Sequence, residues 1–247
     1  MHRLNLDRRA VLAGAAGLLA AGPAAAKVGV DLPQFKCTEF IRRGAGLTRE
    51  QFADHWRQVR APLVRQLPGL KKLAFNLIDE AHSPHASYDG TVELWFDSAA
   101  AYDAAFNGVH GDLSEQLIAD AKTFMQPDFM GLFTHEVVIR ELQAGMAPKV
   151  KRMGLVRRRA DLSRSAFIKT WRDDHAALAN MGYGIQRYVL NIIDRDRMPD
   201  CPWDGYAEFW WPDWATVDEG ARRPRPPEQL AEKQPFGDTL LLRMVED

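Results

Sequence analysis

The chain has 247 residues, of which 46% are hydrophobic and 26% charged, with a formal net charge of −1. These proportions are typical of a globular protein and exclude a disordered, collagen-like or coiled-coil chain. The longest basic run is three arginines at 157–159 and there are two cysteines, so the sequence predicts neither a nucleic-acid-binding protein nor a disulfide scaffold.

The first 26 residues have the layout of a secretory signal. Arg8 and Arg9 precede an apolar stretch over residues 10–21, and three alanines at 24–26 form a cleavage site. The arginine pair resembles a twin-arginine (Tat) signal, so the Tat export machinery is an expected partner of the precursor. A membrane anchor is the alternative, but about 16 apolar residues fall short of the roughly 20 that a span needs. We expect a soluble periplasmic protein, cleaved after about residue 26 and without a membrane anchor.

The rest of the chain is an internal repeat with an offset of 115 residues. Residues 36–97 and 151–212 align without a gap, with 20 of 62 positions identical. Two rare tryptophan pairs share this register, which makes coincidence untenable: Trp56 with Trp171, and Trp95 with Trp210. The sequence therefore predicts two homologous domains, 36–142 and 150–247, joined near residues 143–149.

Both copies predict the same order of elements, strand–helix–strand–strand–helix–strand. In copy one the expected strands and helices cover 35–43, 48–67, 72–79, 91–96, 98–124 and 133–140. In copy two they cover 150–158, 163–181, 187–194, 206–211, 213–233 and 239–245. This order is that of a ferredoxin-like α+β domain. Each domain leaves one sheet face to be covered, so we expect the two copies to pack sheet to sheet in one chain.

The first helix of each copy carries an apolar stripe. Thr48 has the capping-box partner Gln51 three residues later, which predicts the start of the helix. The spacing of four, three and four residues predicts one buried face. The stripe consists of Phe52, Trp56, Val59 and Leu63 in copy one, and of Phe167, Trp171, His175 and Leu178 in copy two.

Two motifs resemble the EthD family. One is the helix motif, GLTREQFADHWRQVRAPL in copy one and DLSRSAFIKTWRDDHAAL in copy two; the other is the strand motif, DGTVELWFDS and DGYAEFWWPD. The resemblance covers residues 36–247 and implies an intramolecular dimeric α+β barrel with a pocket between sheet and helices. Relatives in this superfamily include cofactor-free monooxygenases, isomerases, cyclases and some haem enzymes, so the fold does not decide the reaction.

The family motif places a histidine four residues after the helix tryptophan, and only copy two keeps it. His175 stands there, whereas copy one has Arg60. A histidine beside Trp171 could act as general acid or base, or be a core residue satisfied by a carbonyl. Arg60 could clamp an anion, or extend to solvent. We therefore expect His175 to be catalytic and the active pocket to lie in 150–247.

Several further residues could line the substrate pocket. The predicted substrate-binding residues are Trp56, Arg60, Trp171, Asn191, Glu208 and Trp210. Glu208 and its equivalent Glu93 could move protons beside a tryptophan, but a cross-strand ion pair with Arg157 and Arg42 is the stronger interpretation. Asn191 could donate to a ligand oxygen, and the tryptophans are more often core than binding platform.

The histidines do not predict a metal site. His82 and His85 lie in a loop without a third histidine, which favours a solvated turn. His110 lies where some relatives place a haem-ligating histidine, so haem remains an alternative to the expected absence of any cofactor. Cys37 and Cys201 do not occupy matching repeat positions, and we expect no catalytic role for them.

The leading hypothesis is a cofactor-independent, oxidoreductase-type enzyme, or an isomerase or lyase. Its expected partner is a small hydrophobic or aromatic, oxygenated molecule, and a homo-oligomer is an open possibility. A periplasmic carrier that binds the same kind of molecule without chemistry is the rival from another class.

Overall fold

The computed structural model describes residues 34–108, 111–231 and 234–246. The predicted leader at 1–26 lies outside these residues. The chain divides into two compact units. Unit 1 contains the described residues 34–75 and 88–131, and unit 2 contains 76–87 and 132–246.

Unit 1 is built on three strands. They are β1 (Phe35–Ile41), β3 (Gly90–Phe96) and the first part of β2 (Lys72–Ile78), in the order β1-β3-β2. β1 and β3 run antiparallel, from Phe35 opposite Phe96 to Ile41 opposite Gly90. Every residue of β1 and β3 is buried. This burial on both faces explains why these strands read as short runs without solvent-facing positions.

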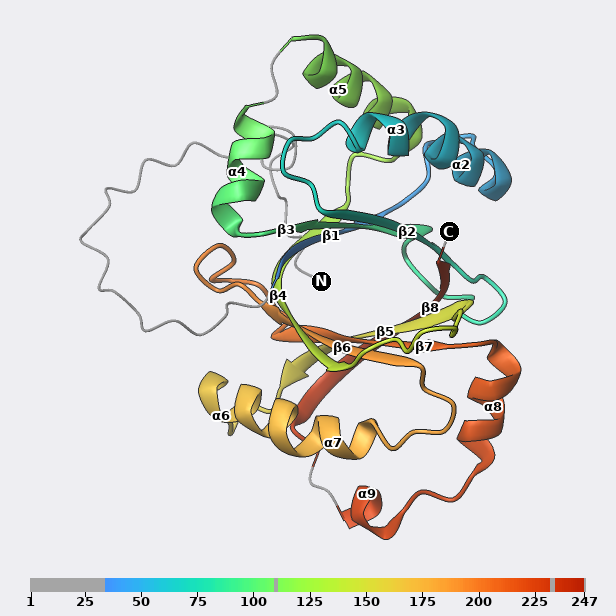
Figure 1. The fold of residues 1–247 in the computed structure, drawn as a ribbon, viewed down its shortest axis with the longest axis vertical. Coiled ribbons are helices and arrows are strands. Elements are labelled where there is room, and N and C mark those ends of the chain that lie inside the picture. Colours follow the sequence, from blue (N-terminus) through green and yellow to red (C-terminus); the bar gives the residue numbers. More distant parts are fainter. Residues whose placement is uncertain (1–33, 109–110, 232–233, 247) are drawn as a thin grey trace, which may run out of the picture. The chain divides into compact units, whose positions relative to one another are not determined.

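The helices of unit 1 lie on one side of its strands (Figure 1). They are α2 (Arg49–His55), a π-helical turn η1 (Trp56–Arg60), α3 (Ala61–Val64), α4 (Ala99–Asn107) and α5 (Asp112–Phe124). The predicted capping box is confirmed: the Gln51 amide donates to the Thr48 hydroxyl over 3.1 Å, and the Thr48 amide donates to Gln51 Oε1 over 2.8 Å. Phe52 stacks on Phe124 with ring centroids 4.7 Å apart, so aromatic packing joins α2 to α5.

Unit 2 contains six neighbouring strands in the order β2-β8-β5-β7-β6-β4. Besides the end of β2, they are β4 (Met130–Arg140), β5 (Val150–Arg158), β6 (Arg187–Ile193), β7 (Gly205–Trp211) and β8 (Phe236–Glu246). The four strands of the second repeat, β8-β5-β7-β6, follow the ferredoxin-like order of fourth, first, third and second. The ends of β2 and β4 extend this sheet: Asn76 to Ile78 pair with β8, and Thr134 to Arg140 pair with β6. Both outer strands of the second repeat therefore have a hydrogen-bonded neighbour, which protects their edges.

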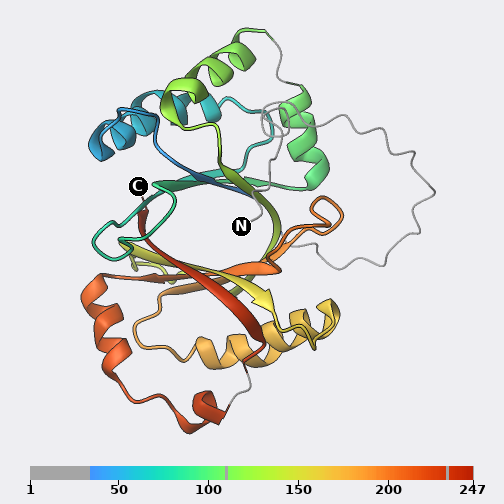
Figure 2. The same ribbon diagram turned by 180° about the vertical axis from the view of Figure 1, so that it is seen from behind.

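The helices of unit 2 also gather on one side of its strands, as the rear view shows (Figure 2). They are α6 (Arg164–Lys169), a second π-helical turn η2 (Thr170–His175), α7 (Ala176–Ala179), α8 (Trp214–Arg222) and α9 (Pro227–Ala231). The expected helix over 213–233 is broken between α8 and α9, where Pro224 and Pro226 remove amide donors. Phe167 and Trp171 are fully buried in the core beneath α6 and η2.

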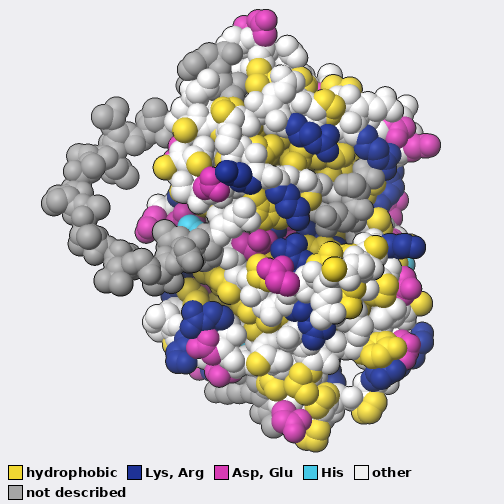
Figure 3. Space-filling view, in the orientation of Figure 1, with side chains coloured by type: hydrophobic (Ala, Val, Ile, Leu, Met, Phe, Trp, Pro, Cys, Tyr) yellow, Lys and Arg dark blue, Asp and Glu magenta, His cyan; other side chains and the backbone are white. Residues whose placement is uncertain are grey.

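The surface carries charges of both signs. On the face shown in Figure 3, basic and acidic side chains are interspersed with apolar ones and form no large patch of one sign. In the described part of the chain no helix is long and apolar enough to span a bilayer.

Candidate functional site

A small cavity lies in unit 1, between the β1–β3 strands and the helices. The volume of the cavity is about 20 Å³. Its wall is apolar except for one carboxyl and one guanidinium group. The residues that line it are Glu39, Arg60, Val64, Leu67, Val92, Leu94, Phe106 and Leu117. A cavity of roughly 10–15 Å³ holds one water, so this space accepts a molecule of about that size.

Glu39 places an acid in an apolar wall. Alternation along β1 sends Cys37, Glu39 and Ile41 to the helix side of the strand, and Lys36 and Thr38 to the other side. The Glu39 side chain is buried, and burial raises its pKa to about 7 although the positive charge of Arg60 opposes the rise. A carboxyl with this pKa exchanges a proton readily near neutral pH.

Arg60 reaches the cavity because the helix widens. The Ala61 amide donates to the Trp56 carbonyl five residues earlier, which defines the π-helical turn η1. The prediction that Val59 belongs to the apolar stripe was wrong: Val59 is 41% exposed and Arg60 is buried. A π-helical turn contains one more residue than an α-helical turn, so the inward position moves on by one.

The Arg60 guanidinium is held by two acceptors on α5. Arg60 Nη1 donates to the Leu117 carbonyl over 2.9 Å and to Asp120 Oδ2 over 3.3 Å. The other oxygen of Asp120 lies 2.5 Å from His55 Nε2, and the His55 ring stacks on Phe124. Asp120 therefore links a histidine that is about one-quarter exposed to the buried arginine, and fixes the arginine in place.

His175, at the repeat position of Arg60, is not part of the lining of this cavity. It ends the turn η2, is half-buried, and its ring makes an edge contact with Phe236 at 4.8 Å. The repeat equivalent of Glu39 is Gly154, and a Cβ there would lie 3.1 Å from Leu241 Cδ2. Copy two therefore has no acid at the position that Glu39 holds in copy one. The assignment of His175 as the catalytic residue stays a prediction.

The predicted binding residues separate into two groups in unit 2. Trp171 belongs to the helix-side core, together with Phe209 and Trp211 of β7. Because side chains alternate along a strand, Glu208 and Trp210 point to the opposite face of the sheet. The structure does not bring His175 together with Glu208. In unit 1, Trp56 is a core residue that stacks on Phe75 with centroids 4.5 Å apart.

Glu208 and Asn191 form a buried polar cluster with a lysine. Lys151 Nζ lies 2.5 Å from Glu208 Oε1, and Asn191 Nδ2 donates to Glu208 Oε2 over 2.8 Å. The Lys151 ammonium also lies 4.7 Å from the ring centre of Trp210. All of these side chains are buried, so the cluster has no path to solvent in this conformation.

The predicted ion pairs of Glu93 and Glu208 with arginines were wrong. Glu93 Oε1 lies 3.0 Å from Lys36 Nζ, and Lys36 is the repeat equivalent of Lys151. Arg157 Nε instead donates to the Pro202 carbonyl, and Arg42 pairs with Asp128. Each lysine lies two residues before the residue that pairs with the glutamate across the strands, so lysine and glutamate share one face of the sheet. Both lysine side chains are fully buried.

Three residues of this site were not predicted from the sequence: Glu39, Asp120 and His55. One signal was present, because Glu39 aligns with Gly154 in the repeat. A charged residue that only one copy keeps on a buried strand marks a place where the copies have diverged. Asp120 lies beyond the ungapped alignment, so the repeat gave no comparison for it.

Neither a metal site nor a haem site is seen among the described residues. Among the described residues no group of three or more His, Cys, Asp or Glu side chains could hold a metal ion. The unit 1 cavity has no histidine in its lining and is far smaller than a haem. His110, which the resemblance suggested as a haem ligand, lies outside the described residues.

Comparisons with solved structures define the fold class. An anthrone oxidase-like protein matches with a TM-score of 0.60 at 7% identity, over 87% of this chain and 92% of that one. A candidate monooxygenase from Lactobacillus acidophilus NCFM matches with a TM-score of 0.55 at 13% identity, over 87% of this chain and 94% of that one. A mutant chlorite dismutase from Candidatus Nitrospira defluvii matches with a TM-score of 0.51 at 12% identity, over 87% of this chain and 92% of that one. These are dimeric α+β barrels, and the predicted fold class of tandem ferredoxin-like domains is confirmed.

Sequence comparison agrees with this result. No curated protein sequence matches the chain. The model of the EthD domain matches twice, at residues 44–128 and 159–234, once in each repeat. The two matches together cover more than half of the 247 residues. The chain therefore belongs to the EthD family.

Proposed function

We propose that this protein is a cofactor-independent oxidoreductase-type enzyme whose proton-transfer group is Glu39. One observation carries the proposal: a carboxyl with a pKa of about 7 shares a small, largely apolar cavity with a guanidinium. The acid can accept a proton near neutral pH, and a guanidinium provides a positive charge beside it. The pair suits removal of a proton from a carbon or hydroxyl acid, with the resulting enolate or phenolate stabilised by the arginine.

The substrate class that fits this pair is a small hydrophobic or aromatic ketone or phenol. Six of the eight lining residues are apolar, and the charged pair is the polar part of the wall. The cavity holds only a water-sized molecule, so a larger substrate enters when side chains such as Phe106 and Leu117 move aside. Both side chains come from the helices, which leaves the strand wall and Glu39 in place.

The oxidation needs no reductant besides the substrate. Glu39 takes one proton from a methylene group that a carbonyl acidifies, either directly or through aromatic rings as in anthrone, and the carbanion transfers electrons to O2. The O–O bond then breaks: one oxygen stays on the carbon as a new carbonyl, and the other leaves as water with both methylene hydrogens. Each CH2 group and one O2 thus give one C=O group and one H2O. The oxidoreductase-like structural neighbours support this class of reaction.

Oxygen uptake with anthrone as probe tests the proposal. We expect the mature chain to consume O2 and form the quinone, and Glu39→Gln to lower kcat by about 10²-fold or more, since general base catalysis contributes that much. Arg60→Gln should also lower kcat, because it removes the charge that stabilises the enolate. His175→Ala should keep turnover.

Two results would contradict this function. If His175→Ala abolishes turnover and Glu39→Gln does not, the chemistry belongs to the second repeat, as sequence analysis predicted. If the mature chain binds anthrone without consuming O2, it is a carrier. We also propose that the protein works in the periplasm, on the basis of the signal in residues 1–26.

A further inference from the structure

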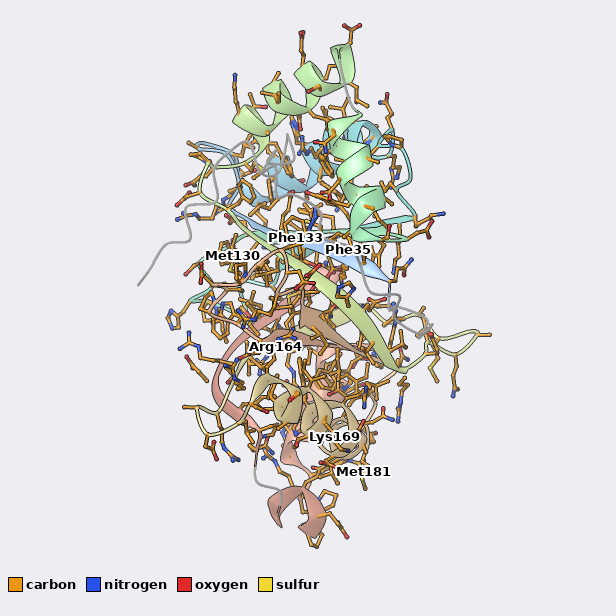
Figure 4. The ribbon with its side chains drawn as sticks, turned by 90° about the vertical axis from the view of Figure 1, so that its left-hand side faces the viewer. Phe35, Met130, Phe133, Arg164, Lys169 and Met181 are labelled. Atoms are coloured by element: carbon orange, nitrogen blue, oxygen red, sulfur yellow. The ribbon has the colours of Figure 1, made fainter. Side chains whose placement is uncertain are left out.

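A second, open recess lies in unit 2, away from the helix-side core. We call it the arginine groove. It has a volume of about 560 Å³, and its lining includes Arg157, Arg158, Arg164 and Arg195 but only two carboxylates, Asp200 and Asp204. Arg164 begins the helical segment that continues through Lys169 towards Met181 (Figure 4). Four guanidinium groups against two carboxylates leave the groove positively charged.

Two of the arginines have a structural task. Arg195 donates to the carbonyls of Cys201 and Trp203 over 2.6 and 2.8 Å, and to Asp204 Oδ1 over 3.0 Å. Arg158 Nη1 lies 2.5 Å from the same Asp204 oxygen. These bonds hold the loop before β7. Asp204 is the shared partner of both arginines, so one negative charge faces two positive charges.

The other two arginines keep donors for a ligand. Arg164 Nη2 donates to the Ile193 carbonyl over 2.5 Å, while its buried Nε has no hydrogen-bond partner among the described residues. Arg157 Nε donates to the Pro202 carbonyl, but its ion pair with the exposed Asp238 is long, at 4.0 Å. Each guanidinium has five N–H donors, so both residues retain donors beyond those that these bonds use.

The electrostatics of Arg164 point the same way. Burial, followed by the positive charges of Arg195 and Arg158, lowers the pKa of Arg164, although Asp204 and Asp194 oppose this. A lowered arginine pKa means that the local environment disfavours the cation. A bound anion would relieve this unfavourable environment.

The repeat shows that this charge is specific to copy two. Three of the four arginines and Asp204 have identical equivalents in copy one, at Arg42, Arg43, Arg49 and Asp89. The equivalent of Arg195 is Glu80, an exchange that changes the local charge by two units. Holding the loop in place does not by itself require this change from a negative to a positive side chain.

We propose that the arginine groove binds the oxyanion group of a small organic ligand, a phosphate or a carboxylate, with Arg157 and Arg164 as its contacts. The planar guanidinium fits both groups with paired hydrogen bonds. The groove is separate from the Glu39 cavity, so this site does not depend on the proposed reaction.

Calorimetric titration of the mature chain at low ionic strength tests the site. Inorganic phosphate and succinate are the probes, and sodium chloride at equal ionic strength is the reference. We expect saturable binding of at least one probe, and the stronger of the two identifies the group. Arg164→Gln should weaken this binding about tenfold or more, because a charge-assisted hydrogen bond contributes roughly 1.5–3 kcal/mol.

Arg159→Gln is the matched control. Arg159 adjoins Arg158 and loses the same charge, but it lies outside the lining and pairs with Asp161. The affinity of the Arg159→Gln variant for the probe should stay close to that of the unchanged protein. Equal weakening in both variants, or no saturable binding of either probe, would overturn the proposal. If Arg164→Gln does not fold, as judged by circular dichroism, Arg157→Gln replaces it, because this side chain is about half exposed.

Discussion

Replacing Glu39 with glutamine should remove a pH dependence from the stability of the protein. The folded carboxyl has a pKa of about 7, against 4.5 for the ordinary group. Between these values the folded protein keeps a proton that the unfolded chain releases, so the free energy of unfolding falls as the pH rises. The contribution of Glu39 is most favourable below pH 4.5 and is lost as the pH passes through about 7.

The size of this effect follows from the two pKa values. The interval from 4.5 to about 7 corresponds to a loss of about 3 kcal/mol by about pH 8, since each pKa unit is worth about 1.36 kcal/mol. Glutamine has nearly the same shape and carries no charge at any pH. Glu39→Gln should therefore resemble the unchanged protein at about pH 4.5 and exceed its free energy of unfolding by about 3 kcal/mol at about pH 8.

Urea titrations followed by tryptophan fluorescence measure this difference at both pH values. Glu50→Gln is the control, because it removes the same charge from an exposed position at the start of α2. The reasoning fails if Glu39→Gln shifts the free energy of unfolding equally at the two pH values, since the carboxyl would then titrate alike in the folded and unfolded chains. A gain at high pH together with lost turnover would show that the raised pKa is retained for chemistry at the cost of stability.

Three further outcomes can be checked. Glu208→Gln should lower the free energy of unfolding by about 3–5 kcal/mol in urea titrations because it leaves the Lys151 charge buried without its partner, and changing both residues to apolar ones should recover most of the loss. Asp120→Asn should cost about 1.5–3 kcal/mol in the same assay, and a loss below about 0.5 kcal/mol would mean that it does not hold its arginine. Changing Arg8 and Arg9 to lysine should leave precursor in the cytoplasm on cell fractionation, and normal delivery to the periplasm would exclude a twin-arginine signal.

The repeat and the fold class of each half were predictable from the amino-acid sequence alone. The paired tryptophans and the 115-residue offset predicted two copies of one α+β plan, because residues that are buried in both copies diverge slowly in an aligned register. The starts of the helices were predictable as well. Thr48 and Ser163 each accept a hydrogen bond from the backbone three residues later, which is a local interaction.

Which side chains share a cavity depends on long-range packing and was not predictable from the sequence. An ideal helical period places Val59 inward, but the π-helical turn η1 exposes it and buries Arg60. Likewise Glu93 and Glu208 pair with lysines that lie far from them in the sequence, Lys36 and Lys151. The antiparallel register of the strands sets these pairs, and local spacing does not. Such contacts depend on how strands pair over long separations.

The Glu39 cavity illustrates the same limit. Its acid comes from β1 and the guanidinium beside it from η1. The carboxylate that fixes Arg60 comes from α5, 60 residues further along the chain. Each residue is unremarkable in its own segment. The raised pKa of Glu39 arises only when helices cover the strand and exclude water, because desolvation is a property of the packed structure and not of the sequence pattern.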